Sequence, residues 1–208
     1  MEIYLEEVKN HLPDCFERYF KMIKNIDNGS FGVVVHAIYL DTKQEVAVKI
    51  INKDKQRNLS KLIQEILILQ ELKHPNIVEF YNYIETENKF YVIMEYIGGA
   101  FINDKTAQSI INVNKDKSFR EEEVACIIKN LLSAIDYIHA KDIVHRDIKP
   151  DNILLGDKKD FNKIKLIDFG LSAQYFEDNK EMDFCGTLIY MPPEQIGHKI
   201  YSRVIDNI

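Results

Sequence analysis

The chain has 208 residues, of which 46% are hydrophobic and 29% are charged, which is enough for one or two small domains with an apolar core. A net charge of −6 without a basic stripe argues against nucleic-acid binding. No apolar run is long enough to span a membrane, and the acidic residues 1–7 do not resemble a signal peptide. Three widely separated cysteines without metal-ligand spacing favour a reducing compartment, so we expect a cytoplasmic or nuclear protein.

The first half of the chain combines short strand-like runs with one helix. β-Branched residues dominate 33–35 and 46–51, on either side of a turn at 41–43, and predict two strands. Apolar residues at three- and four-residue steps then predict a helix, with Glu65 beside their stripe and able to point inward. The stripe consists of Leu59, Leu62, Ile63, Ile66, Leu69 and Leu72. Two more strands are expected near 77–84 and 89–95.

Past the glycines at 98–99 the pattern becomes helical, which indicates a second part of the fold. The segment 118–121 has the Ser-x-x-Glu form of a capping box. A long helical stripe follows, made of Val124, Ile127, Ile128, Leu131, Leu132, Ile135 and Ile138. Short strands are expected at 153–155 and 164–167, with polar blocks on the loops at their ends. The predicted division is an extension over 1–19, a small lobe over 20–95 and a larger one over 96–208.

Two polar blocks carry the most chemical information. The first is His145-Arg146-Asp147-Ile148-Lys149-Pro150-Asp151-Asn152, and the second is Asp168-Phe169-Gly170. An Asp can take a proton from an attacking hydroxyl, and a Lys two residues later can meet a phosphate. An Asn and a second Asp can each hold a magnesium ion, because hard cations prefer oxygen ligands.

These blocks, in this order, resemble those of the eukaryotic protein kinases of the Ser/Thr type. Further segments match the family in sequence order: the glycine-rich loop at 26–34, the third strand at 46–49, the hinge at 94–97 and the end of the activation segment at 186–194. Pro192 stands where the family usually has Ala. The hinge and both polar blocks are most similar to the calcium/calmodulin-dependent and calcium-dependent protein kinase group.

The resemblance implies an α+β fold of two lobes: a small antiparallel β lobe with one helix, and a mainly α-helical lobe that is incomplete. It implies transfer of the ATP γ-phosphate to Ser or Thr hydroxyls of protein substrates, with ATP and Mg²⁺ as cofactors. A regulatory partner is possible but unidentified. One alternative is a truncated kinase-like module that binds a nucleotide or a partner without catalysis. A small-molecule kinase of similar fold is disfavoured by Thr187 and the Pro-Pro-Glu ending at 192–194.

The resemblance also assigns roles to individual residues. Asp147 would accept the hydroxyl proton, Lys149 would stabilise the transferring phosphate, and Thr187 would hydrogen-bond near both. The expected catalytic residues are Asp147, Lys149, Asn152, Asp168 and Thr187, with Asn152 and Asp168 holding the metal. The expected nucleotide-binding residues are Ile26, Gly29, Ser30, Phe31, Gly32, Val34, Ala47, Lys49, Glu65, Met94, Glu95, Ile97 and Leu154.

The chain departs from the family pattern at several positions. Asp27 replaces the first glycine of the loop and should weaken ATP binding, and Ala100 stands where an acid usually follows the double glycine. Asp183 occupies a position that often carries an activating phosphate, so we expect it to pair with Arg146. The chain is expected to stop before the central helix of the larger lobe. Asp206 is expected to steady the catalytic loop.

Overall fold

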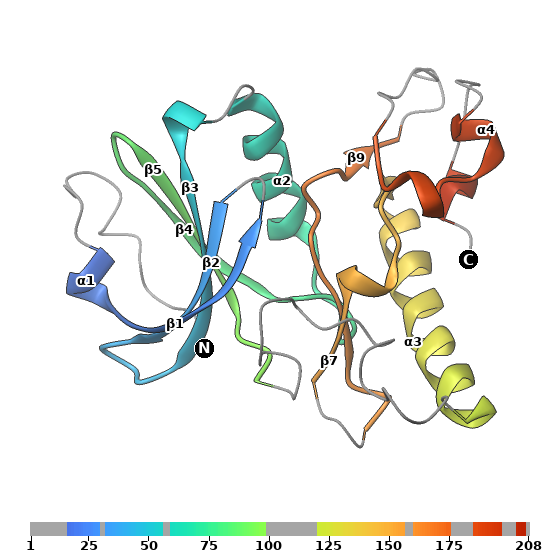
Figure 1. Cartoon of the computed structure of the whole chain (residues 1–208), viewed down its shortest axis with the longest axis horizontal. Coiled ribbons are helices and arrows are strands. Elements are labelled where there is room, and N and C mark those ends of the chain that lie inside the picture. Colours follow the sequence, from blue (N-terminus) through green and yellow to red (C-terminus); the bar gives the residue numbers. More distant parts are fainter. Residues whose placement is uncertain are drawn as a thin grey trace.

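The computed structural model describes residues 16–29, 32–55, 59–98, 120–156, 160–175, 185–196 and 203–206. Figure 1 shows two groups of elements side by side: a twisted sheet with helix α2, and helix α3 with short strands around it. The first group comes from the N-terminal half of the chain and the second from the C-terminal half. This two-part α+β arrangement is the one that the sequence predicts.

The sheet has five antiparallel strands in the order β1-β2-β3-β5-β4. A short helix, α1 (Phe16–Tyr19), precedes it. The strands are β1 (Phe20–Gly29), β2 (Gly32–Tyr39), β3 (Glu45–Asn52), β4 (Phe80–Glu85) and β5 (Lys89–Glu95). The strands expected in 33–51 and 89–95 are confirmed, whereas β4 begins at Phe80 rather than near residue 77. The sequence analysis missed β1, whose polar residues gave no strand pattern.

Strand β3 separates the core of the sheet from a cavity on its other face. Successive side chains of a strand point to opposite faces. Val46 and Val48 are fully buried against residues of β2 and β5, where β-branched side chains pack well. Ala47 and Lys49 point the other way and line the cavity. The alternation in this strand therefore places a charged group opposite an apolar core.

Helix α2 (Leu59–Glu71) presents a narrower buried face than predicted. The helix itself is confirmed, and its buried residues are Leu62, Glu65, Ile66, Ile68 and Leu69. Leu59 and Ile63, expected in the apolar stripe, are instead exposed. They lie on the flank of the helix that turns away from the core. Glu65 is buried, as its place beside the stripe predicted.

Helix α3 (Glu121–His139) is the main helix of the second group (Figure 1). Most of its predicted stripe faces the core, but Val124 and Leu132 are exposed, because the helix is covered on one side only. The Glu123 carboxylate accepts the Arg120 backbone N–H at 2.9 Å and so caps the first turn. The capping box is thus formed by Arg120 and Glu123 and not by the expected 118–121, and Ser118 lies outside the described residues.

Short elements follow α3 and carry the polar blocks. Strands β6 (Ile143–Val144) and β9 (Ala173–Gln174) form one antiparallel pair. Strands β7 (Ile153–Leu155) and β8 (Ile164–Leu166) form another, which confirms the strands expected there. A short helix, α4 (Pro193–Ile196), comes near the end of the described chain.

One cluster of buried side chains joins the two groups. It includes Leu69 of α2, Leu131 and Ile135 of α3, and Leu166 of β8. Each fully buried side chain of this size contributes roughly 1.5–3 kcal/mol. Backbone hydrogen bonds add to the connection, since Val78 donates to the Leu166 carbonyl at 3.0 Å. The shared core fixes the loops of the second group against the open face of the sheet.

Within the described part of the chain, no helix combines the length and apolar character needed to cross a bilayer.

Candidate active site

A cavity of about 490 Å³ is lined by residues of both groups of elements. All five expected catalytic residues line it, and so do ten of the expected nucleotide-binding residues. These ten are Ile26, Gly32, Val34, Ala47, Lys49, Glu65, Met94, Glu95, Ile97 and Leu154. Ser30 and Phe31 lie outside the described residues, and Gly29 pairs with Gly32 at the ends of their strands.

Gly32 is a position of the loop that requires glycine. Its φ of +153° is rarely adopted by residues with a side chain. A Cβ atom there would also overlap the carbonyl oxygen of Ile50 on the neighbouring strand. Strand β2 can therefore begin this close to β3 only with glycine at its first residue.

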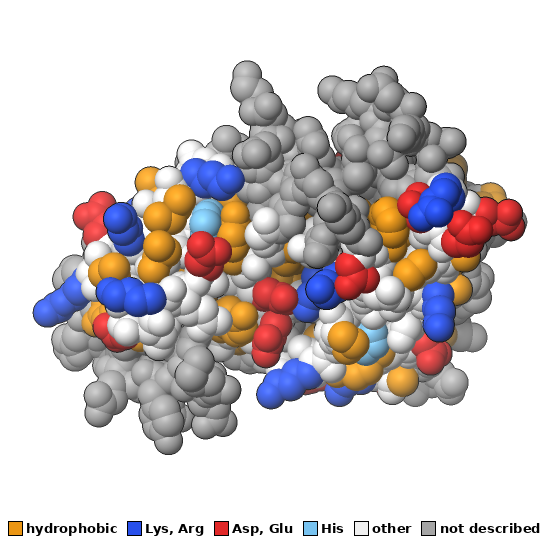
Figure 2. Space-filling model, turned by 90° about the horizontal axis from the view of Figure 1, so that it is seen from below, with side chains coloured by type: hydrophobic (Ala, Val, Ile, Leu, Met, Phe, Trp, Pro, Cys, Tyr) orange, Lys and Arg blue, Asp and Glu red, His pale blue; other side chains and the backbone are white. Residues whose placement is uncertain are grey.

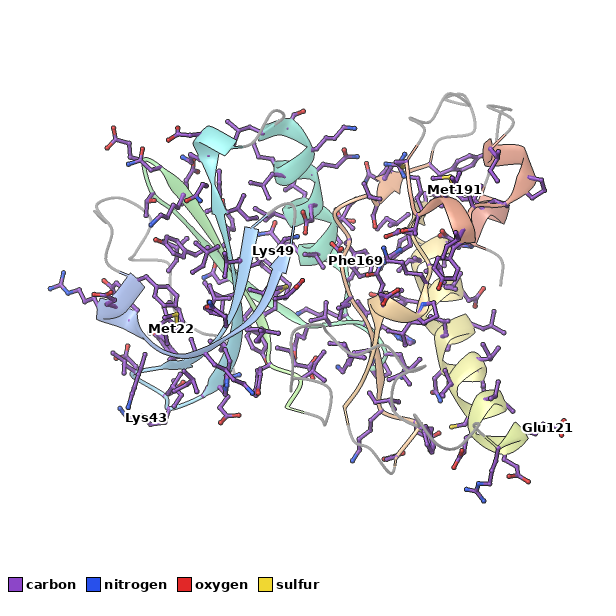
Figure 3. The ribbon with its side chains drawn as sticks, in the orientation of Figure 1. Met22, Lys43, Lys49, Glu121, Phe169 and Met191 are labelled. Carbon is purple, nitrogen blue, oxygen red and sulfur yellow. The ribbon has the colours of Figure 1, made fainter. Side chains whose placement is uncertain are left out.

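Lys49 and Glu65 form an ion pair at one side of the cavity. The Lys49 Nζ donates to the Glu65 Oε1 at 2.5 Å and lies 3.8 Å from the Asp168 Oδ1. Burial opposes the charged form, but the carboxylates of Glu65 and Asp168 outweigh it and hold the pKa of Lys49 above its usual value. Figure 3 shows Lys49 on the sheet and Phe169, next to Asp168, on the facing segment. The ammonium group is thus fixed and charged where the two groups of elements meet.

Asp147, Lys149 and Thr187 form a closed set of hydrogen bonds. The Thr187 hydroxyl donates to Asp147 Oδ1 at 2.7 Å, and Lys149 Nζ donates to Thr187 Oγ1 at 2.8 Å. Lys149 Nζ also lies 2.8 Å from Asp147 Oδ2. Burial would raise the pKa of Asp147, but these donors and the Lys149 charge outweigh it and lower that pKa. Asp147 is therefore a carboxylate that can accept a proton.

Asn152 and Asp168 offer oxygen atoms suited to a divalent cation. The Asn152 side-chain N–H groups donate to the backbone carbonyl and Oδ2 of Asp147, at 2.8 and 3.0 Å. That orientation leaves the amide oxygen of Asn152 as the group available to a ligand. Asp168 has a φ of +61°, an unusual value for a residue other than glycine. Both residues line the cavity, so the donor set fits a hard cation.

The loop that carries Asp147 is held by Asp206. This carboxylate is 1% exposed and accepts the backbone N–H groups of His145 at 2.7 Å and Arg146 at 2.8 Å. It also lies 3.0 Å from His139 Nε2 on α3. The expectation that Asp206 steadies the catalytic loop is therefore confirmed.

Asp183, the partner expected for Arg146, lies outside the described residues. The described contact of the Arg146 side chain is to the backbone: its Nε donates to the Leu171 carbonyl at 2.6 Å.

The segment that follows β5 contains a contact that the sequence analysis missed. Tyr96 lines the cavity, and its ring stacks on His36 of β2, with centroids 3.6 Å apart and planes 4° apart. The Glu95 backbone N–H already donates to the Glu79 carbonyl, so it is not free for the edge of an adenine. No periodic pattern signals the stacked pair, since His36 of β2 and Tyr96 after β5 are far apart in the sequence.

The family model for the protein kinase domain matches residues 20–207 of this sequence. The chain belongs to the protein kinase family. Kinases of this family use ATP and a divalent metal ion, and their substrates are proteins. The oxygen donors of Asn152 and Asp168 and the ammonium of Lys49, already placed around one cavity, are consistent with that chemistry.

Several curated kinases are similar to this kinase chain. Calcium-dependent protein kinase 5 of Plasmodium berghei is 37% identical over 194 residues, which cover 93% of this chain and 33% of that protein. The SNF1-related protein kinase catalytic subunit alpha KIN12 of Arabidopsis thaliana is 35% identical over 204 residues, 97% of this chain and 39% of that protein. Serine/threonine-protein kinase dst1 of Dictyostelium discoideum is 35% identical over 196 residues, 94% of this chain and 25% of that protein. The chain spans between 25% and 39% of the length of these three relatives.

Several charged side chains line the cavity or lie at its edge. Figure 2 shows acidic and basic side chains close together near the middle of one face. One described pair at the edge of the cavity is Glu95 with Lys165, whose charged atoms lie 2.7 Å apart. Asp27, the departure from the glycine pattern, also lines the cavity. The site therefore combines an apolar region with a strongly charged one.

Proposed function

We propose that the chain transfers the γ-phosphoryl group of ATP to Ser or Thr hydroxyls of protein substrates, with Mg²⁺ as the metal. The observation that carries this proposal is the Asp147 carboxylate, hydrogen-bonded by Lys149 and Thr187 and facing the same cavity as the Lys49–Glu65 pair. Phosphoryl transfer depends mainly on positioning and charge neutralisation, and these groups supply both.

The nucleotide would lie along the cavity with its base at the apolar end. Val34 and Ala47 from the sheet and Leu154 from β7 line that end. Lys49 would hold the α- and β-phosphates, because its ammonium is fixed by Glu65 and lines the cavity. Asn152 and Asp168 would hold Mg²⁺, which supplies positive charge against the phosphate oxygens when it is bound.

Asp147 would act on the acceptor hydroxyl. The carboxylate accepts the hydroxyl proton while the hydroxyl oxygen forms a bond to the γ-phosphorus. The bond between that phosphorus and the oxygen bridging to the β-phosphate breaks, and ADP leaves with the electron pair. Lys149 lies 2.8 Å from the same carboxylate, so its charge can stabilise the transferring phosphoryl group.

Two features support a Ser or Thr acceptor in a polypeptide. Lys149 lies two residues after Asp147, as in Ser/Thr kinases, and its ammonium donates to the Thr187 hydroxyl. Leu188 and Ile189 directly follow Thr187 and are 63% and 80% exposed, so apolar surface is available beside the catalytic carboxylate for an extended peptide. The relative dst1 of Dictyostelium discoideum is named a serine/threonine-protein kinase, which agrees with this choice.

The test is transfer of labelled phosphate from ATP and Mg²⁺ to a general protein substrate by the purified 208-residue chain. Asp168→Asn should abolish transfer because it removes a carboxylate from the metal site. Asp136→Asn, the same change at an exposed position of α3, should leave the rate unchanged. Acid hydrolysis of the product should release phosphoserine or phosphothreonine. Phosphotyrosine in the product, or equal transfer by the Asp168→Asn variant, would refute the assignment.

The same assay separates catalysis from binding alone. A folded chain that binds ATP but transfers nothing would support the alternative of a kinase-like binding module. Such a module usually needs one catalytic group to be replaced or displaced. Among the described residues, Lys49, Asp147, Asn152 and Asp168 all line one cavity, which favours catalysis.

A further inference from the structure

Asp27 of β1 and Lys49 of β3 lie in line with each other on the sheet, with β2 between them. In the register of β1 and β2 Asp27 lies opposite Val34, and Val34 lies opposite Lys49 in the register of β2 and β3. Residues that pair across neighbouring strands point to the same face of a sheet, so the three side chains form one row. All three line the cavity, which confirms that this is the inner face.

The Asp27 carboxylate acts on the same ammonium group that would hold the phosphates. Its charge, with those of Glu65 and Asp168, contributes to the raised pKa of Lys49. Asp27 is half-buried, and among the described residues it has no cation within ion-pair distance. Its charge is therefore not cancelled locally and extends into the cavity.

The cavity has more acidic than basic side chains. Its basic residues are Lys49 and Lys149, and its acidic residues are Asp27, Glu65, Glu95, Asp147, Asp151 and Asp168. Glu65, Glu95 and Asp147 each lie within 3 Å of a lysine nitrogen, so their charges are largely balanced. Asp27 has no such partner among the described residues. A polyanionic nucleotide entering this space meets repulsion that a divalent cation on the phosphates would reduce.

We propose that Asp27 makes the site selective for nucleotide whose phosphates are already neutralised by a divalent cation. The carboxylate repels the phosphate chain in proportion to its net charge, and it has little effect on the uncharged base and sugar. This inference rests on the proposed function, because it takes the nucleotide to be bound in this cavity. It concerns selectivity between charge states of the nucleotide, and it places the selecting group on β1, outside the metal-binding residues.

The test is an equilibrium binding titration of the full chain with three ligands: ATP with Mg²⁺, ATP with a chelator, and adenosine. Asp27→Asn keeps the shape of the side chain and removes its charge. It should tighten binding of metal-free ATP about 10-fold, binding of the magnesium complex about 3-fold or less, and binding of adenosine not measurably. Asp27→Glu should retain the selectivity of the wild type.

Asp54→Asn is the matched control, because Asp54 is exposed and does not line the cavity. It should leave all three affinities unchanged, and thermal melting should show that every variant is folded. Equal tightening of the three ligands by Asp27→Asn, or no tightening of metal-free ATP, would overturn the inference while leaving the proposed function intact. A folded wild type that binds neither form of ATP would refute the proposed function, and the inference with it.

Discussion

The Thr187 hydroxyl lies between the two charged groups that act on the acceptor. It donates to Asp147 at 2.7 Å and accepts from Lys149 at 2.8 Å. Thr187→Val replaces this oxygen with a methyl group and keeps the β-branched shape. Thr187→Ser keeps the oxygen and removes the methyl group. The pair of variants therefore separates the hydrogen bonds from the volume of the side chain.

The size of the effect follows from the charges on both partners. A hydrogen bond to a charged group contributes about 1.5–3 kcal/mol when no water replaces it. Thr187 is half-buried, so water can compensate for part of the loss. We expect Thr187→Val to raise the activation free energy by about 2 kcal/mol, which lowers kcat/KM roughly 30-fold. Thr187→Ser should stay within about 3-fold of the wild type.

The pH profile should move as well. Hydrogen bonds from Lys149 and Thr187 help to lower the pKa of Asp147 against the opposing effect of burial. Removing the Thr187 donor destabilises the carboxylate and raises that pKa. Because catalysis requires the carboxylate, the acid limb of kcat/KM should move to higher pH in Thr187→Val and stay in place in Thr187→Ser.

The assay is steady-state peptide phosphorylation at saturating ATP over a pH series. Thermal melting of each variant provides the control for folding. If Thr187→Val matches Thr187→Ser in rate and in acid limb, the hydroxyl does not act on Asp147, and the reasoning is refuted.

Three other changes test the framework around the site. Asp206→Asn should lower the free energy of unfolding, measured in urea, by about 2–3 kcal/mol, because a buried carboxylate that accepts two backbone N–H groups is lost. A loss no larger than that caused by Asp136→Asn at an exposed position would contradict this. Lys49→Met should lower the free energy of unfolding by about 3 kcal/mol, because it leaves Glu65 buried without its cation. Adding Glu65→Leu should restore stability in the same urea assay but not phosphate transfer, and a double variant as unstable as the single one would disprove the account. Burial lowers the pKa of His36, so the folded state loses stability as pH falls below the unfolded pKa of about 6.5. His36→Phe should therefore flatten the fall in melting temperature between about pH 7.5 and 5.5. An unchanged slope would rule out His36 as the source of that fall.

Short-range patterns predicted the elements that position the site. The β-branched residues of 46–51 predicted the strand that carries Lys49, and the apolar period of 59–72 placed Glu65 where it can point inward. Both follow from the geometry of a single element. Leu59 and Ile63 were wrongly expected in the buried stripe, because periodicity shows which face is apolar and not how much of it a neighbouring element covers.

Long-range contacts were accessible only through the family resemblance, or were missed. The contact between Thr187 and Asp147 joins residues 40 positions apart, and no local pattern indicates it. The stacking of His36 on Tyr96 was missed for the same reason, since it depends on how β2 meets the segment after β5. Strand β1 was missed because its pairing with β2, rather than its own composition, makes it a strand.

The contacts of Asp206 have a consequence for the order of folding. The side chain binds the His145 N–H across 61 positions of sequence, so this contact closes a long loop and forms late relative to the local turns. During synthesis, a chain that has left the ribosome only as far as Thr187 already contains every side chain of the proposed chemistry. It does not yet contain the carboxylate that shapes the loop around Asp147. Phosphate transfer should therefore begin only after the segment Arg203–Asp206 has emerged and docked.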